Sequence, residues 1–538
     1  TWTGDLGRLR SLTRDIAQWS RSPETGVQDG IEVQYAKYVQ TLHEWIAGIG
    51  DYGYQAATAA LASAARSGIH VIQHHLTARA AFGAFCSGDL AAGKTRLDQI
   101  HALAELSPPT RMHLFQYHYL PGWHLLLTGD AAGALKDAEA SLQLSSRSGA
   151  SVFHQAFSSM VAAHALLAMD RSEESRDHID AVMDIARNFG SPIIEFSGLL
   201  LKAKFLLAGG TATSTQRGLD ALRKALALGK KQGYLNTVVW YPAAMEVLCR
   251  AALEHGIEEQ YVRDLITKRE LVPDAPPIHL ENWPWRYRIY ALSGFSIVKD
   301  GKTLRFVGRV RQKPLDMLKA LIAMGGSDVS VWLLIEALWP DAEGDTAQRS
   351  FDTNLHRLRI MLGNDDALVL REGKLTLDNR FVWIDAWAFE RLLGKAADAS
   401  RKTDAHQEAT AALLEKALAL YHGHFLQDVS EAWVVSMRER LRNKCLRAVM
   451  DLGRYWEGRQ DRDKAVRCYE QGIEVDDLAE ELYRRIMAIY RDQGRFAEGL
   501  SVHHRCREVL RARHGIAPSE ETEELHRSIR SSAKTSPS

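Results

Sequence analysis

The chain has 538 residues, 46% of them hydrophobic and 25% charged, and its formal net charge is +0. This length and composition indicate a globular protein of about three or four domains. No apolar run approaches about 18 residues and the first residues lack an apolar signal segment, so we expect a cytoplasmic protein without a membrane contact. The five cysteines form no Cys-x-x-Cys pair, which argues against a disulfide framework and a zinc knuckle.

Residues 1–272 carry an internal repeat. Breaker pairs recur at 38 to 41 residues, and Ala/Leu-rich helical patterns flank each of them. The pairs are Gly50-Asp51, Gly88-Asp89, Gly129-Asp130, Met169-Asp170 and Gly209-Gly210. Two helices in about 40 residues are typical of a tetratricopeptide-like solenoid. We therefore predict a helical sensor or interaction solenoid over residues 1–272.

The segment Gly88–Thr95 fits the nucleotide-binding P-loop expression G-x-x-x-x-G-K-[ST]. A true P-loop follows a strand and opens a helix, so that backbone N–H groups can surround phosphate. Here the preceding residues have a helical pattern, and a Gly-Asp pair with a nearby glycine recurs at residues 129–133. The pattern therefore favours a turn between helices over a nucleotide site, and we expect no cofactor on this chain.

Histidine and aromatic side chains cluster between residues 113 and 124. They could line a ligand-binding surface of the solenoid, although packing in the core is the favoured alternative. The candidate ligand residues are His113, Tyr117, His118 and Trp123. The sequence has no catalytic or metal-binding motif that would indicate an enzyme.

A proline-rich linker at residues 273–285 precedes a region that is typical of a winged helix-turn-helix, residues 286–390. Short alternating runs with a turn at residues 299–301 predict an antiparallel sheet. Three helical patterns follow within residues 309–362, and a hairpin turn is expected at residues 372–374. Trp332 and Trp339 are expected in the core of this region.

The third of these helices has the pattern of a recognition helix. Phe351, Leu355, Leu358 and Leu362 form one apolar stripe. Arg, Thr, Asn and His side chains on the remaining faces would suit a major groove. Between residues 299 and 319 there are seven Lys or Arg against two Asp, a local basic excess that phosphate binding requires.

Residues 391–530 are expected to form a second helical-repeat domain. Tyr455 and Ile489 lie 34 residues apart, as do Tyr469 and His503, which is the tetratricopeptide period. A disordered tail is predicted at residues 531–538. The predicted fold class is thus mainly α, with an α+β winged domain between two helical-repeat domains.

Two adjacent segments resemble known families. Residues 286–390 resemble the OmpR/PhoB-type winged-helix DNA-binding domain, most clearly at RSFDTNLHRLRIML, residues 349–362. Residues 413–530 resemble the bacterial transcriptional activator domain, through YHGHFLQDV, EAWVVSMRERLR and LYRRIMAIYRDQGRFAEGLSVHHRCREVL. This order is that of SARP-type bacterial regulators.

The N-terminal repeat resembles the sensor solenoid of maltose-regulon-activator-type ATP-dependent regulators, over residues of about 30–270. Such proteins usually carry an ATPase module before the solenoid. The chain starts at Thr rather than Met, so the resemblance implies that this module has been removed. ATP would then bind only to the missing module.

The winged-helix resemblance implies roles for individual residues. Base contacts are expected from Asp352, Thr353 and Arg357, and minor-groove contacts from Arg371 and Lys374. Phosphate contacts are expected around Arg349, His356 and Arg359. The full set of expected DNA-binding residues is Arg309, Arg311, Lys313, Arg349, Ser350, Asp352, Thr353, Asn354, His356, Arg357, Arg359, Arg371 and Lys374.

These features predict a DNA-binding transcriptional regulator, most simply an activator. The expected partners are double-stranded promoter DNA, RNA polymerase and neighbouring copies of the chain, with an inducer or a protein bound to the solenoid. The alternative is a helical-repeat scaffold whose winged domain binds protein rather than DNA.

Overall fold

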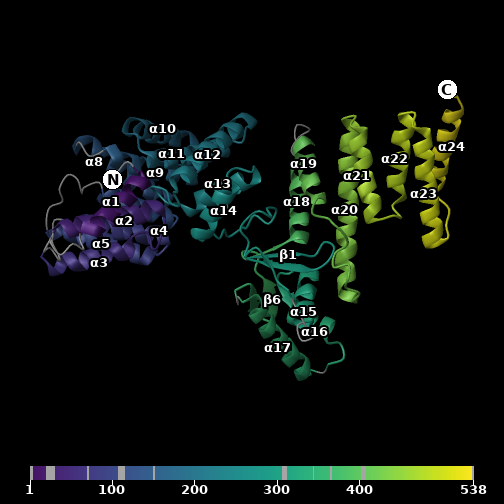
Figure 1. Ribbon diagram of the computed structural model, residues 1–538, viewed down its shortest axis with the longest axis horizontal. Coiled ribbons are helices and arrows are strands. Elements are labelled where there is room, and N and C mark those ends of the chain that lie inside the picture. The colour runs from purple at the N-terminus through teal and green to yellow at the C-terminus, as the bar shows by residue number, and fades with distance from the viewer. Residues whose placement is uncertain are drawn as a thin grey trace. The chain divides into compact units, whose positions relative to one another are not determined.

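The computed structural model describes residues 4–19, 31–68, 72–106, 116–148, 152–305, 312–342, 344–363, 366–401 and 407–535. The chain divides into two compact units, Thr1–Pro273 and Asp274–Ser538 (Figure 1). The division falls within the proline-rich stretch. Among the described residues, no helix has the length and apolar character needed to cross a membrane.

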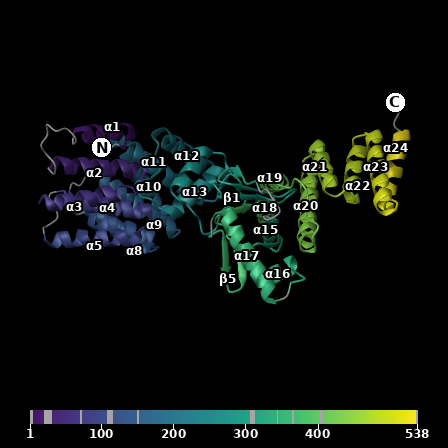
Figure 2. The same cartoon turned by 60° about the horizontal axis from the view of Figure 1, so that its bottom comes forward.

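The described residues of unit 1 form a solenoid of helices, which follow one another in chain order (Figure 2). After α1 (Leu6–Trp19) come pairs of antiparallel neighbours. The pairs are α2 (Ile31–Ala47) with α3 (Tyr54–Arg66), α4 (Gln73–Ser87) with α5 (Leu90–Leu106), α7 (Gln116–Leu127) with α8 (Ala131–Ser148), α9 (Val152–Ala168) with α10 (Ser172–Phe189), α11 (Pro192–Ala208) with α12 (Ala212–Gln232), and α13 (Pro242–Glu254) with α14 (Glu259–Lys268).

Each predicted breaker is the turn inside one of the first five pairs. Each breaker contains a residue with a left-handed backbone: Gly50, Gly88, Gly129 and Gly210 have φ between 59° and 93°. Asp170 takes the same conformation, with φ 58°, where the repeat has no glycine. Asp is among the few residues that tolerate this region, which explains why the fourth breaker reads Met-Asp.

The P-loop-like segment is such a turn. It follows helix α4, not a strand, and Gly88 ends that helix. Asp89 Oδ1 accepts a hydrogen bond from the backbone N–H of Ala92 at 2.9 Å. Asp130 Oδ1 likewise accepts from Gly133 N at 2.8 Å in the next repeat. The predicted inter-helix turn is therefore confirmed.

An irregular buried segment, residues 234–241, lies at the centre of the solenoid. It contacts the first helix of all five breaker-containing pairs, α2, α4, α7, α9 and α11. The contacts are hydrogen bonds from Asn236 Nδ2 to Trp45 O and to Cys86 Sγ, from Trp123 Nε1 to Trp240 O and from Val238 N to Ser197 Oγ, and a ring contact between His164 and Tyr241. The inner face of the repeat is thus filled by its own chain.

The winged region of unit 2 contains two small sheets and three helices. The four-stranded sheet has the order β3-β2-β1-β7, in which β1 and β7 are parallel, and the three-stranded sheet has the order β4-β6-β5. The strands are β1 (Tyr287–Tyr290), β2 (Ser296–Lys299), β3 (Lys302–Thr303), β4 (Val329–Ser330), β5 (Leu368–Arg371), β6 (Lys374–Leu377) and β7 (Val382–Ile384). The helices are α15 (Gln312–Ala323), α16 (Val331–Leu338) and α17 (Gly344–Leu362).

The remaining helices of unit 2 form the second helical-repeat region. They are α18 (Asp385–Ser400), α19 (Gln407–Leu418), α20 (Ala432–Gly458), α21 (Arg462–Val475), α22 (Glu480–Asp492), α23 (Phe496–His514) and α24 (Glu520–Thr535). The prediction of a disordered tail is wrong for residues 531–535, because these helix-compatible residues complete α24. Residues 536–538 lie outside the described part.

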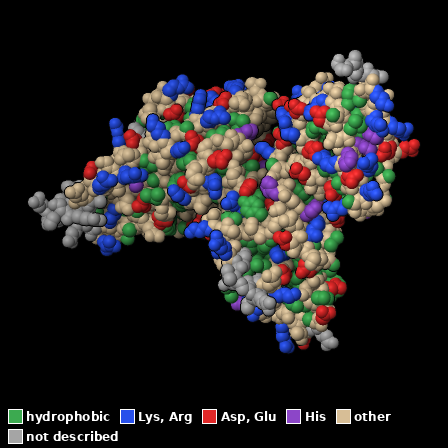
Figure 3. Space-filling view, turned by 45° about the vertical axis from the view of Figure 1, so that its right-hand side comes forward, with side chains coloured by type: hydrophobic (Ala, Val, Ile, Leu, Met, Phe, Trp, Pro, Cys, Tyr) green, Lys and Arg blue, Asp and Glu red, His purple; other side chains and the backbone are tan. Residues whose placement is uncertain are grey.

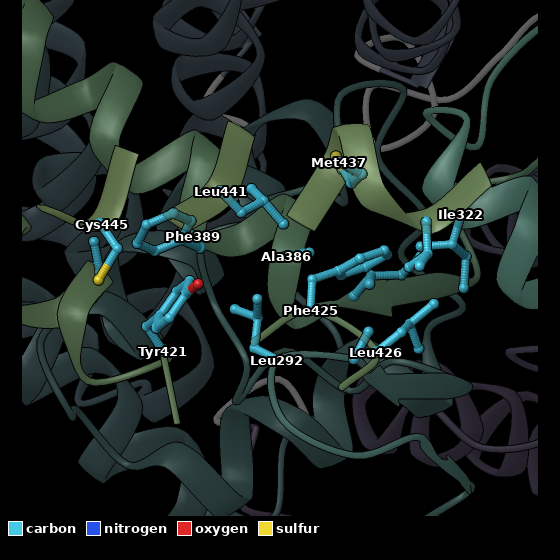
Figure 4. Close-up of a cluster of buried hydrophobic side chains, with 14 of the residues drawn as sticks. Leu292, Ile322, Ala386, Phe389, Tyr421, Phe425, Leu426, Met437, Leu441 and Cys445 are labelled. Atoms are coloured by element: carbon cyan, nitrogen blue, oxygen red, sulfur yellow. The ribbon is translucent and has the colours of Figure 1, made fainter. Parts of the chain in front are cut away.

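The winged region and the helical repeat share one hydrophobic core. A single cluster of buried side chains runs from Tyr287 of β1 to Ile529 of α24. In Figure 4, Phe425 lies among Leu292, Ala386 and Ile322, which come from both regions. The boundary predicted at residue 390 falls inside α18, so this helix belongs to both regions.

The linker is partly packed onto the winged region. Trp283 and Trp285 are buried, and Trp383 Nε1 donates to the carbonyl oxygen of Ile278 at 2.8 Å. The fold class predicted from the sequence is confirmed: the protein is mainly α, with a solenoid, a winged helix-turn-helix and a second helical repeat.

Candidate nucleic-acid interface

Helix α17 buries the predicted apolar stripe and exposes a polar face. Phe351, Leu355, Leu358 and Leu362 are at most 3% exposed. The exposed side chains on the other faces include Arg349, Asp352, Thr353, His356 and Arg357. The stripe anchors α17 against α15, which contributes the buried Met317, Leu318 and Leu321 to the same core. A helix held in this way keeps its polar face fixed toward solvent.

Asn354 does not belong to that face, so its prediction as an outward-pointing contact is wrong. Its side chain is 7% exposed, and Asn354 Nδ2 donates to the carbonyl oxygen of Ser350 at 2.8 Å. Asn354 adjoins Leu355 and follows Phe351 by three residues, which places it at the margin of the buried stripe. Ser350 is half-buried and supplies only this backbone acceptor.

Arg359 makes a hydrogen bond inside the protein. It is half-buried, and Arg359 Nη2 donates to the carbonyl oxygen of Leu368 in β5 at 2.9 Å. This bond ties the end of α17 to the hairpin that follows it, and Figure 2 shows α17 and β5 next to each other. This bond gives Arg359 a part in positioning α17, and its expected phosphate contact stays a prediction.

The C-terminal end of α17 is capped by the four-stranded sheet. The carbonyl oxygen of Leu362 accepts hydrogen bonds from Lys299 Nζ at 2.7 Å and from Tyr287 Oη at 2.5 Å. A cation at a helix C-terminus offsets the negative end of the helix dipole. Lys299 was counted in the local basic excess, but its charge serves to position α17.

The β5–β6 hairpin has the geometry of a wing. Arg371 and Lys374 are directly paired across it, and both are exposed. The turn between them uses Glu372 and Gly373, both with positive φ, which is the conformation of a tight two-residue hairpin turn. The tip therefore carries two cations, with the carboxylate of Glu372 in the turn between them.

The basic residues around the start of α15 are only partly described. Arg309 and Arg311 lie outside the described residues. Lys313 is exposed, and its Nζ lies 3.4 Å from the carbonyl oxygen of Leu338. This places Lys313 near the end of α16, on the winged region.

Trp332 is exposed, contrary to the expectation that it packs in the core. It is 65% exposed, whereas Trp339 is partly buried against the core. Helix α16 buries Val331, Leu334 and Leu338, and a side chain one residue beyond this stripe is turned by about 100° to the solvent side. The apolar character of α16 on all sides hid this orientation in the sequence.

The aromatic cluster of the solenoid does not form a ligand surface around Trp123. That side chain is fully buried, and its Nε1 donates to the carbonyl oxygen of Trp240 at 3.0 Å. Tyr117 Oη lies 2.6 Å from His74 Nε2, and His118 Nδ1 lies 3.9 Å from Asp137 Oδ1. His113 is outside the described residues. The prediction that Trp123 is a ligand residue is therefore wrong, because its side chain lies in the core.

A groove that the sequence did not reveal lies between α18, α19 and α20. Its volume is about 1060 Å³, and it is lined by basic side chains that include Lys444, Arg447 and Arg454. Its walls come from residues 390–459, which are far apart in sequence. No local pattern could have identified it, because the groove depends on how the three helices pack.

On the face shown in Figure 3, basic and acidic side chains are interspersed, in keeping with the formal net charge of +0. Local basic sets are present, such as Arg349, His356 and Arg357 on α17 and Arg371 and Lys374 on the wing.

Comparisons with known proteins agree with this architecture. Residues 384–530 match the bacterial transcriptional activator domain family. The chain is 29% identical over 237 residues to the regulatory protein AfsR of Streptomyces griseus, and the match covers 43% of this chain. It spans only 23% of the length of AfsR.

Solved structures show partial likeness. Mycobacterium tuberculosis EmbR in complex with a low-affinity phosphopeptide is 19% identical, with a TM-score of 0.37 over 46% of this chain and 69% of EmbR. The hetero-tetramer Cut9–Hcn1 of APC/C is 12% identical, with a TM-score of 0.27 over 94% and 98% of the two chains. At these scores, neither defines the arrangement of this chain. Through an activator domain that continues directly from a winged helix, this part of the chain is similar to SARP-type regulators.

Proposed function

We propose that this chain is a cytoplasmic transcriptional regulator that binds double-stranded promoter DNA through α17 and the β5–β6 wing. The observation that carries the proposal is the exposed polar face of α17, which lies opposite a fully buried stripe. A major groove about 12 Å wide accepts such a helix. Arg357 is suited to guanine, and Asp352 and Thr353 to neighbouring base edges.

The wing supplies the second contact. Arg371 and Lys374 face each other across the hairpin, so both reach the same stretch of DNA backbone or minor groove. Arg359 and Lys299 act indirectly, because they fix the end of α17 to β5 and to the four-stranded sheet. In this proposed interface, one set of residues contacts DNA and a second set holds the first in position.

The activator region would place a regulatory surface at a fixed orientation to the DNA. It shares its hydrophobic core with the winged region, so α17 and the helices α18–α24 behave as one body. We propose that this region contacts RNA polymerase or a neighbouring copy of the chain on DNA. Relatedness to the activator domain family supports this role.

Unit 1 would receive a signal from a small molecule or a partner protein. Residues 234–241 already fill the face formed by the first helices of the pairs. A partner would therefore bind the outer helices, such as α3, α5, α8, α10 and α12. This proposal is tested by the effect of candidate ligands on DNA binding by the full chain.

The central test is selection of genomic fragments by the full chain, followed by fluorescence anisotropy at two salt concentrations. We expect a short repeated motif, bound with a steep salt dependence. Arg357→Ala should cost about 1–3 kcal/mol on that motif, and Lys374→Ala should lower the salt slope by about one.

Arg467→Ala is the matched control, because Arg467 is an exposed arginine on α21, outside the winged region. Binding that is equally weakened by Arg357→Ala and Arg467→Ala would contradict the interface. An absence of DNA binding at low salt would favour the scaffold function instead, with the exposed Trp332 as a protein contact.

A further inference from the structure

The groove between α18, α19 and α20 has an apolar floor. Its volume is about 1060 Å³, and the fully buried residues of its lining are all apolar. These residues are Ala396, Ala411, Leu414 and Ala448. Because three of them are alanines, the floor is shallow enough for the backbone of another helix to come close.

The wall that α18 contributes is kept low by a glycine. Gly394 lies inside α18 and is exposed, and a Cβ atom at this position would meet nothing within 4 Å. A glycine inside a helix makes that helix less stable than an alanine would. No contact within the chain requires a glycine here, so its effect is to leave the groove wider than any other residue would.

The rim of the groove is basic. Five Lys or Arg side chains line the groove against two carboxylates, those of Glu390 and Asp451. The basic residues are Arg401, Lys444, Arg447, Arg454 and Arg459, of which the four arginines are exposed. The groove thus carries an excess of positive charge in a chain whose formal net charge is +0, and this excess favours an acidic occupant.

The arginines of the rim are available to such an occupant. Arg447 has no ion pair with any residue that the structure describes, and its Nε donates to the carbonyl oxygen of Asn443 at 3.3 Å. Arg454 lies 3.5 Å from Glu481, and both side chains are more than half exposed. Surface pairs of this kind contribute little to stability, so they exchange readily for contacts with a bound molecule.

We propose that this groove binds an acidic amphipathic α-helix of a partner protein. The part of α20 that lines the groove runs from Lys444 to Arg459, which is about 22 Å and matches about four turns of a bound helix. An apolar stripe on that helix would cover the floor, and its Asp and Glu side chains would pair with Arg447 and Arg454. The inference rests on the proposed function, because it names the kind of partner that the activator region engages.

The apolar floor favours a protein helix over DNA as the occupant. A DNA duplex presents a row of phosphates, which would pair with the arginines of the rim but leave the apolar floor uncovered. An amphipathic helix matches both parts of the groove, because it carries acidic and apolar side chains on different faces.

The experiment uses the full chain to select from a displayed library of helix-forming peptides of about 20 residues, in which charge and apolar spacing vary. We expect the enriched peptides to be acidic and to carry an apolar stripe. A fluorescently labelled copy of the best peptide should bind the full chain more weakly as the salt concentration rises. Arg447→Glu, which reverses a charge of the rim, and Gly394→Trp, which fills the groove, should each weaken this binding by at least about tenfold.

Arg467→Glu and Gly394→Ala are the matched controls. Arg467 is an exposed arginine on α21 and is not part of the groove lining. Gly394→Ala adds only a methyl group, at a position where nothing lies within 4 Å. Both variants should bind the peptide as the unmodified chain does, and all four variants are checked for retained helicity and thermal stability.

Three results would overturn the proposal: enrichment of neutral or basic peptides, no enrichment at all, or binding that is unchanged in Arg447→Glu and Gly394→Trp. Self-association of the chain that is lost in Arg447→Glu would assign the groove to a second copy instead. Arg447→Glu should leave binding to the selected DNA motif unchanged, and a loss as large as that in Arg357→Ala would make the groove a DNA contact. Peptide binding without any DNA binding would contradict the proposed function but not the acidic helix.

Discussion

Asp385 Oδ2 accepts a hydrogen bond from the backbone N–H of Leu292 at 2.8 Å, although the two residues are 93 positions apart. Asp385 is the first residue of α18 and is 3% exposed. Its two oxygens also accept from Ala291 N at 2.9 and 2.8 Å, and Oδ1 accepts from Ala386 N at 2.7 Å. This carboxylate joins the activator region to the β1–β2 connection of the winged region.

Asp385→Ala should destabilise unit 2 by about 3 kcal/mol, because it leaves buried backbone N–H groups of Ala291 and Leu292 without an acceptor. Urea unfolding followed by tryptophan fluorescence measures the change. Asp385→Asn keeps one acceptor oxygen and should lose less. Equal stability of Asp385→Ala and the unmodified chain would mean that the joint does not depend on this side chain.

The same carboxylate predicts a pH dependence. Burial raises the pKa of Asp385 to about 6 in the folded protein, against its ordinary value of 3.8. The folded state therefore binds a proton more tightly than the unfolded state, so this group's contribution to stability falls as the pH rises from about 4 to about 6. Its size is of the order of 2–3 kcal/mol. Asp385→Asn removes the contribution, so the stability of the unmodified chain relative to this variant should fall across that interval. A constant difference would contradict the shift.

The contact of Asp385 with Ala291 and Leu292 shows what sequence patterns can and cannot predict. The strands, helices and hairpin of the winged region follow from local periodicity and from turn residues such as Asp300-Gly301 and Glu372-Gly373. From the sequence alone, Asp385 is only an acidic residue at the start of a helix. Its partners lie 93 positions away, so its role depends on tertiary packing that no local pattern records.

Alanine substitutions at Arg359 and at Arg357 of α17 should differ in their effect on folding stability. Arg359→Ala removes the bond to Leu368 O and the packing of its aliphatic chain, and should cost about 1–2 kcal/mol of folding stability. Arg357→Ala, at an exposed position, should stay within about 0.5 kcal/mol. Chemical unfolding of both variants tests this. If the two stabilities are equal, the positioning role of Arg359 is wrong.

Arg438 holds the loop that docks onto the winged region. Its Nε donates to Phe425 O at 2.9 Å, and its Nη2 donates to Leu426 O at 2.6 Å and to Val429 O at 2.7 Å. Leu426 N in turn donates to Ala291 O at 2.7 Å. Losing three charge-assisted bonds should cost about 2–4 kcal/mol in Arg438→Ala.

Hydrogen exchange locates this effect. In Arg438→Ala the amide of Leu426 should exchange faster, because the loop opens from β1 more often. Arg440→Ala is the control on the same helix, since Arg440 is exposed and makes a long contact of 3.4 Å with Glu390. Unchanged protection of Leu426 in Arg438→Ala would show that the loop is held by its apolar contacts alone.

Residues 234–241 mark the limit of prediction in the solenoid. The repeat and its turns were visible because glycine and aspartate recur at a fixed spacing. The central segment has no such period, and its buried Asn236 and Thr237 read as ordinary loop residues. Their burial depends on helices from five repeats, so the candidate ligand surface around Trp123 could not be distinguished from a core on sequence alone.

The substitution Trp123→Phe distinguishes a role of Trp123 in the core from a role in ligand binding. The substitution keeps most of the buried aromatic surface but removes the bond to Trp240 O, so a buried acceptor loses its partner. Unit 1 should lose about 1–3 kcal/mol, and amides of residues 234–241 should exchange faster in hydrogen-exchange mass spectrometry. DNA binding by unit 2 should be unaffected when the chain is folded. A Trp123→Phe variant with unchanged stability and lost response to a ligand would restore Trp123 as a ligand residue.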